Sequence, residues 1–233
     1  MGLGLLAALV VVGVVVASAY YFSDKAKMQR RLATVARVDI GRVADGALVK
    51  CLGHVTCEGE PLIAPLSARP CAYYEVRVTQ RRGKRRVTIV RESGGRNFIL
   101  RDGTGKALVK LGGTAPAMRQ VVLHKDTRYS TGTFQDAPAR FEALLARHGQ
   151  SSRGFFFNKD LAFSEGVIEA DEEVVVAGQG RWETDPDPDS GAAGAGYRDG
   201  PRRLVLGPTA EFGLCVSDDV DLLAAAKKTK NMA

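Results

Sequence analysis

The sequence predicts a mainly β domain, either OB-like or a double β-barrel or sandwich, with two short helices and one N-terminal transmembrane helix before it. Two observations favour the β class: short segments alternate apolar and polar residues with period two, and turn residues, including 26 glycines, separate them. A third observation, the uncharged stretch Leu3–Phe22, predicts the transmembrane helix. With 233 residues, 45% of them hydrophobic, the chain is long enough for one anchored domain with its own core.

The anchor is expected over residues 1–23. As a helix, about 20 residues with a rise of ~1.5 Å each span a ~30 Å hydrocarbon core. Basic residues follow the stretch at Lys25 and Lys27 and none precedes it, so the positive-inside rule places the N-terminus outside and the C-terminal domain in the cytoplasm. The alternative is a cleaved signal peptide, because Ala17–Ala19 matches a small-x-small cleavage site. The missing basic n-region favours a single-pass anchor.

The net charge of +7 is concentrated after the anchor, in a later hairpin and at the C-terminal end. This distribution favours a membrane surface over nucleic acid as the anionic partner. Residues 24–43 are expected to form a basic juxtamembrane helix or linker, either near anionic headgroups or simply solvated. Three further regions are expected: a β-rich domain at 44–228, a flexible loop at 183–201 within it, and a basic tail at 229–233.

The stretch Gly46–Thr79 organises the predicted domain. Val49, Cys51 and Gly53 alternate with Lys50 and His54, which predicts a strand with the first set toward the core and the second partly wet. Two prolines then mark a loop rather than a central strand, and alternation resumes with aromatic and β-branched residues.

The string Gly46–Val78, with G-x-V, A-P-L-S and C-x-Y-Y-E-V, resembles the GIDE domain. That domain is the membrane-flanked part of mitochondrial RING-type ubiquitin ligases and has bacterial and archaeal relatives. Phe98–Val109 and Ser164–Gly178 fit the same pattern, so the similarity covers roughly residues 44–225. The resemblance implies a candidate recognition loop at Ala64, Pro65, Leu66 and Ser67, and structural positions at Gly53, Tyr74, Asp102, Gly105, Glu165 and Gly178.

The sequence departs from these ligases after Val216, where it has no Cys or His to supply the zinc ligands of a RING. The first function hypothesis is therefore a membrane-anchored, non-enzymatic interaction or scaffold domain with a protein partner. An alternative is an enzyme or enzyme subunit of the ubiquitin-transferase-like family, with a site assembled in space. A third is an OB-like barrel that binds nucleic acid; it is ranked last because only Tyr73 and Tyr74 are near a basic tip for base stacking.

No catalytic residue, metal site or cofactor is predicted. In Cys51-x-x-His54-x-x-Cys57, alternation places the cysteines on one face and the histidine on the other, so they cannot share an ion. Gly103–Lys106 resembles a phosphate loop, but Ala107 follows the lysine and a turn between strands explains it better. Four irregularly spaced cysteines indicate a reducing compartment.

A basic hairpin is predicted at Arg77–Val90, with Gly83 at its turn. Its tip could contact an anionic surface, or its charge could protect the sheet edge from pairing with another copy. The candidate contact residues are Arg81, Arg82, Lys84, Arg85 and Arg86.

Two short helices are predicted. The first lies within 136–149 and has Asp136 as its cap, and the second is Val220–Lys228. A weak internal repeat relates Ala44–Val49 to Ala170–Val175. The repeat is compatible with two related β-units, with one closed barrel and with chance similarity.

Overall fold

The computed structural model describes residues 23–132, 136–154, 158–186 and 202–228. Strands dominate these residues, which confirms the mainly β class. They contain three α-helices, the two predicted within the domain and one in the segment 24–43 that was expected to be a juxtamembrane helix or linker. They also contain the 3-10 helices η1 (Ile40–Arg42) and η2 (Pro116–Met118).

Five strands close into a barrel in the order β1-β6-β7-β12-β11, and β11 pairs back with β1. All neighbours are antiparallel except β7 and β12. The two strands of the weak repeat, β1 and β11, are partners, with Val49 opposite Gly178 and Gly53 opposite Val174. One closed barrel is therefore the correct alternative. The barrel strands are β1 (Leu48–Cys57), β6 (Phe98–Arg101), β7 (Lys106–Val109), β12 (Arg202–Gly207) and β11 (Glu173–Thr184).

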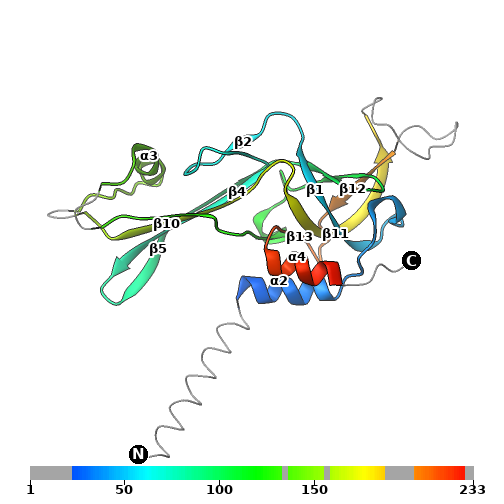
Figure 1. Cartoon of the computed structure of the whole chain (residues 1–233), viewed down its shortest axis with the longest axis horizontal. Helices are drawn as coiled ribbons and strands as arrows, with labels where there is room; N and C mark the ends of the chain where they lie inside the picture. The colour runs from blue at the N-terminus through cyan, green and yellow to red at the C-terminus, as the bar shows by residue number, and fades with distance from the viewer. Residues whose placement is uncertain (1–22, 133–135, 155–157, 187–201, 229–233) are drawn as a thin grey trace, which may run out of the picture.

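A second, four-stranded sheet extends from the barrel in the order β5-β4-β10-β9 (Figure 1). Helix α3 (Ala139–Arg147) covers one of its faces, where Phe141, Leu144 and Leu145 pack against valines and phenylalanine of the sheet. No helix among the described residues covers the other face (Figure 1). The strands are β5 (Arg85–Gly95), β4 (Tyr73–Arg82), β10 (Leu161–Ile168) and β9 (Thr127–Ser130), and a small ribbon of β2 (Leu62–Ile63) and β3 (Pro70–Cys71) lies nearby.

Helices α2 (Asp24–Ala33) and α4 (Val220–Lys228) lie side by side under the barrel sheet (Figure 1). The sheet continues there from β11 through β13 (Leu214–Ser217) to β8 (Arg119–Val122). The helices share one apolar cluster with it, because alternate strand residues point out of the barrel toward them. Its buried members are Met28, Leu32, Leu52, Val175, Ala177, Cys215, Leu222 and Ala226.

The prediction that Lys50 is partly wet is wrong. Its side chain is only 1% exposed, because α2 and α4 cover the face of β1 from which it projects. The Nζ atom donates to the carbonyl of Leu32, at the end of α2, over 2.9 Å. Burial, followed by the nearby charge of Arg37, lowers the pKa of Lys50. His54, on the same strand, is exposed.

The predicted cap of α3 is also wrong. The helix begins at Ala139 with Pro138 at its N-cap, and Asp136 instead accepts a 2.9 Å hydrogen bond from Asn158. The helix ends as predicted before Gly149, which has a φ of 63°.

The predicted anchor at Leu3–Phe22 lies outside the described residues, as do most of the loop at 183–201 and the tail after Lys228. Within the described ranges, no helix is long and apolar enough to cross a membrane.

Candidate functional site

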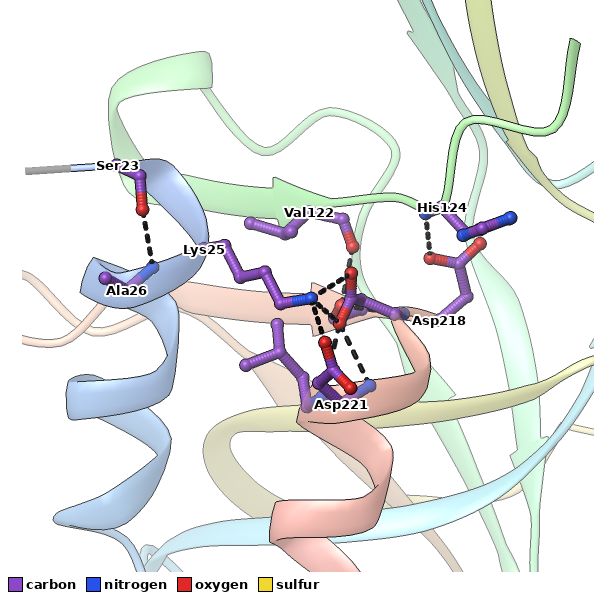
Figure 2. A network of polar contacts seen from close by, with 10 residues as sticks. Ser23, Lys25, Ala26, Val122, His124, Asp218 and Asp221 are labelled. Carbon is purple, nitrogen blue, oxygen red and sulfur yellow. Dashed lines mark hydrogen bonds and ion pairs between the residues drawn. The ribbon is translucent and has the colours of Figure 1, made fainter. Parts of the chain in front are cut away.

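The first turn of α2 is tied to the first turn of α4 by a polar network (Figure 2). Ser23 caps α2 by accepting the N–H of Ala26. Lys25 Nζ lies 2.7 Å from an Asp219 oxygen and 2.6 Å from an Asp221 oxygen. Burial lowers the pKa of Lys25, but hydrogen bonds to these carboxylates outweigh it and raise the pKa overall. The ammonium group is therefore a fixed charge that joins the two helices.

Helix α2 also contacts β8 and the segment before β13, through Arg31 in its last turn and through Asp24 in its first. Arg31 donates to the side-chain oxygen of Gln120 and stacks over the ring of Phe212, 4.6 Å from its centroid. Gln120 in turn donates to the carbonyl of Asp24 over 3.1 Å. These contacts fix the start of α2, the point at which the predicted anchor joins the domain, to the barrel.

A carboxyl pair, the buried Asp218 and the half-buried Glu172, lies at the C-terminal end of β13. Asp218 accepts the N–H of His124 over 2.7 Å (Figure 2) and shares a hydrogen bond with Glu172. Burial, together with the charge of Glu172, raises the pKa of Asp218 to about 7. The two carboxyl groups therefore share a proton in the neutral pH range. They join β13 to the turn before β11 and to the segment after β8.

The loop Ala64–Arg69 between β2 and β3 is held by the buried carboxylate of Glu165, which is 0% exposed. Its two oxygens accept the N–H groups of Leu66, at 2.7 Å, and Ser67, at 2.9 Å. Arg140 of α3 donates to the carbonyl of Leu66. Such charge-assisted bonds to backbone N–H groups are among the stronger ones in proteins. They give the loop one defined conformation.

The four residues of the candidate recognition loop have different surroundings. Ala64 and Leu66 are buried, whereas Pro65 and Ser67 are half-buried. Next to them, Ile63 is 61% exposed although it is a large apolar residue. Any partner of this loop would therefore contact Ile63, Pro65 and Ser67.

The other positions marked by the family pattern support the fold. A Cβ atom at Gly53 would collide with the carbonyl of Arg101, and one at Gly178 would lie 2.6 Å from the carbonyl oxygen of Gly207. Asp102 accepts the N–H groups of Thr104, Gly105 and Ile40, and a Cβ at Gly105 would lie 3.2 Å from Ile40. Tyr74 donates to Glu92 over 3.1 Å.

The predicted basic hairpin is confirmed as β4 and β5, with Gly83 at a φ of 61°. The candidate contact residues Arg81, Arg82, Lys84, Arg85 and Arg86 are all exposed. Asp160 lies beside two of them, 3.1 Å from Arg86 and 3.8 Å from Arg81. Part of the charge at the tip is therefore neutralised within the domain.

The thiols lie in apolar surroundings. Cys51, Cys71 and Cys215 are buried and Cys57 is half-buried. Burial raises the pKa of Cys51 and of Cys71 to about 12, so both thiols are protonated and poor nucleophiles at neutral pH. Within the described ranges, no group of three or more His, Cys, Asp or Glu side chains has the geometry to hold a metal ion.

Sequence reasoning missed two features. The pairing of Lys25 with Asp219 spans 194 positions, and no local pattern indicates it. Arginines on the open face of the four-stranded sheet were also missed, although Arg77 between Val76 and Val78 carries the period-two signal for an outward-facing row. Comparison with protein-family models, curated proteins and solved structures finds no match for this chain.

Proposed function

We propose that this chain is a membrane-anchored, non-enzymatic docking domain, similar to the GIDE domain, that presents a protein-binding loop at a fixed position near the bilayer. The observation that carries the proposal is the attachment of α2 to α4 and β8 through Lys25, Arg31 and Gln120. The predicted anchor, residues 1–23, ends where α2 begins at Asp24, so a span there would leave little freedom between the bilayer and the barrel. A flexible linker would instead let the domain rotate.

The arrangement of the loop supports this proposal. Figure 1 shows β2, which leads into the loop, on the upper side of the molecule and α2 on the lower side. The β2–β3 loop would then lie on the side away from the bilayer, where a partner could reach it. The conformation of the loop is set in advance by Glu165, which reduces the entropy lost on binding.

A photo-crosslinking residue at position 63 in the anchored full chain tests the proposal. We expect adducts with one protein partner from position 63, and their loss when Glu165→Gln removes the charge that fixes the loop. Val87 provides the matched control, because it is an apolar, 41% exposed residue on β5. The proposal is wrong if position 87 gives the same adducts, or if positions 63, 65 and 67 give none.

The enzyme alternative rests on the Asp218–Glu172 pair, because carboxyl groups with strongly shifted pKa values cluster at active sites. Asp218 is only 6% exposed, and its oxygen is occupied by the N–H of His124. A substrate would have to displace the segment between β8 and β9 to reach it. The docking function needs no such rearrangement.

A further inference from the structure

The open face of the four-stranded sheet carries a row of arginines. Val76 and Val78 of β4 point toward α3, so Arg77 between them points to the opposite side. The strand registers place Arg91 of β5 directly opposite Arg77, Ser164 of β10 on its other side, and Arg128 of β9 beyond Ser164. One row across four strands therefore holds three arginines.

The positive charge of this row exceeds what its neighbours neutralise. Glu75 lies between two of the arginines, 3.6 Å from Arg77 and 3.5 Å from Arg91, which is longer than a good hydrogen bond. The buried Nε of Arg77 has no hydrogen-bond partner among the described residues. Burial, and then the charge of Arg77, lower the pKa of Lys125; Glu75 opposes this shift, and Arg91 and Arg128 add to it, so Lys125 lies within the field of the same cluster.

Small polar side chains lie beside the arginines. A shallow pocket of about 290 Å³ opens on this part of the sheet, next to Arg128. Thr79, Ser130 and Ser164 line it with hydroxyl groups. The Ser164 hydroxyl donates to the Arg77 carbonyl over 3.4 Å. Guanidinium groups beside hydroxyl groups are suited to binding phosphate oxygens.

The aromatic residues near this face argue against single-stranded nucleic acid as the anion. Tyr73 is buried, and Tyr129 projects to the α3 side, where its ring lies 5.0 Å from that of Phe141. Base stacking on exposed aromatic rings contributes much of the affinity of single-strand binding proteins. The described residues of this face offer no such ring, but they do offer the charge that a surface of phosphate groups needs.

The position of the face favours a bilayer. Figure 1 shows α3 above the four-stranded sheet and the start of α2 below it, on the side of the open face. Lys125 lies on the segment that leaves β8, and Gln120 of β8 is bonded to Asp24 at the start of α2. The basic row therefore lies on the side of the molecule where the predicted anchor joins.

We propose that Arg77, Arg91 and Arg128, with Lys125, dock on the phosphate headgroups of an anionic bilayer. For a chain held in that same bilayer, the proposal rests on the anchoring proposed above. Docking would supply the missing counter-charges for the row, and it would hold the sheet flat against the membrane with α3 and the β2–β3 loop on the far side. The exposed tip of the hairpin would extend the same surface.

The test uses the full chain in vesicles, with Cys57→Ser and a fluorophore on Thr88→Cys. Thr88 is exposed on the open face, opposite Thr79. A nitroxide on the lipid headgroup should quench it strongly in phosphatidylcholine mixed with phosphatidylglycerol, and weakly in phosphatidylcholine alone. Because each basic side chain near an anionic surface contributes about 1 kcal/mol, Arg77→Gln, Arg91→Gln and Arg128→Gln together should lower the docked-to-undocked ratio roughly 100-fold.

A matched control removes three charges elsewhere. Arg42, Arg101 and Arg153 are exposed positions outside this face, and their joint change to Gln should leave quenching unchanged. If the triple variant of the face fails to fold, Arg128→Gln alone on the exposed edge strand should still lower the ratio roughly 5-fold.

Three outcomes separate the proposals. If quenching does not depend on phosphatidylglycerol and the chain resists carbonate extraction, the proposal of a docking face is wrong and the proposal of an anchor stands. A chain that carbonate extracts, but that shows quenching on added anionic vesicles, overturns the anchor and supports the face. If poly-dT protects Thr88→Cys from its labelling reagent in neutral vesicles, and phosphatidylglycerol has no effect on quenching, the face binds nucleic acid and the bilayer proposal is wrong.

Discussion

Two sheet faces of this molecule each carry a partly or fully buried cation, and the two cations differ in the partners that surround them. On the barrel, α2 and α4 cover Lys50, whose Nζ donates to the Leu32 carbonyl. On the four-stranded sheet, Arg77 shares the single carboxylate of Glu75 with Arg91, and its buried Nε lacks a partner among the described residues. The covered charge supports the fold, whereas the uncovered charges are suited to a ligand from outside.

Glu165→Ala should have the largest effect on stability. The substitution leaves the buried N–H groups of Leu66 and Ser67 without acceptors, and each should cost about 2 kcal/mol. Urea unfolding should therefore show a loss of about 4 kcal/mol in the free energy of unfolding. Glu60→Ala, at an exposed position, is the control and should change little. A loss below about 1 kcal/mol would show that the loop finds other acceptors.

Leu32→Ala tests the covered face. This side chain is 4% exposed between α2, α4 and β1, so its truncation should leave a cavity and cost about 3 kcal/mol. The same unfolding assay measures it. Ala33→Gly, at the exposed next position, separates this cost from the loss of helix propensity. Equal losses in the two variants would mean that α2 adds little by packing.

Asp218→Asn should remove part of the pH dependence of the stability of the fold. Because the pKa of Asp218 is raised from 3.8 to about 7 on folding, the folded state binds more protons than the unfolded state between these values. The contribution of this group to stability is thus present below about pH 4 and is lost as the pH rises through about 7. Melting temperatures across this range should fall less steeply for the variant, while Asp160→Asn should keep the wild-type slope. Parallel curves for wild type and Asp218→Asn would contradict the shared proton.

Lys25→Ala should cost only about 1 kcal/mol, because the ion pairs with Asp219 and Asp221 are partly exposed and screened by solvent. Its larger effect should be greater mobility of α2, seen as faster amide hydrogen exchange in its first two turns. Lys27→Ala, two positions away and exposed, is the control. Unchanged exchange in Lys25→Ala would mean that Arg31 and Met28 hold the helix without it.

Arg77→Gln should have the smallest effect, and it completes the comparison. Removing one member of a cluster of like charges relieves repulsion, so the free energy of unfolding should change by less than about 0.5 kcal/mol or rise. A fall of 2 kcal/mol or more by urea unfolding, on the order of a lost buried ion pair, would mean that Arg77 is a structural residue.

The sequence predicted local elements better than the contacts between distant ones. Period-two alternation located β1, the basic hairpin and β6–β7, because each depends on neighbouring residues. The burial of Lys50 was missed because the covering helices are remote in sequence. Of the candidate site, the sequence identified the loop residues and Glu165 by resemblance, but it did not show that Glu165 holds the loop. That link joins two residues, Ser67 and Glu165, that are 98 positions apart in the sequence.

The most direct test of a fixed, face-down docking domain compares two labels on the anchored chain. One fluorophore is placed at Thr88→Cys on the open face and the other at Ile63→Cys beside the loop, each with Cys57→Ser. Headgroup nitroxides in vesicles that contain phosphatidylglycerol should quench the first strongly and the second weakly. Equal quenching would show a domain that tumbles at the surface, and stronger quenching at Ile63→Cys would show that the opposite face meets the bilayer.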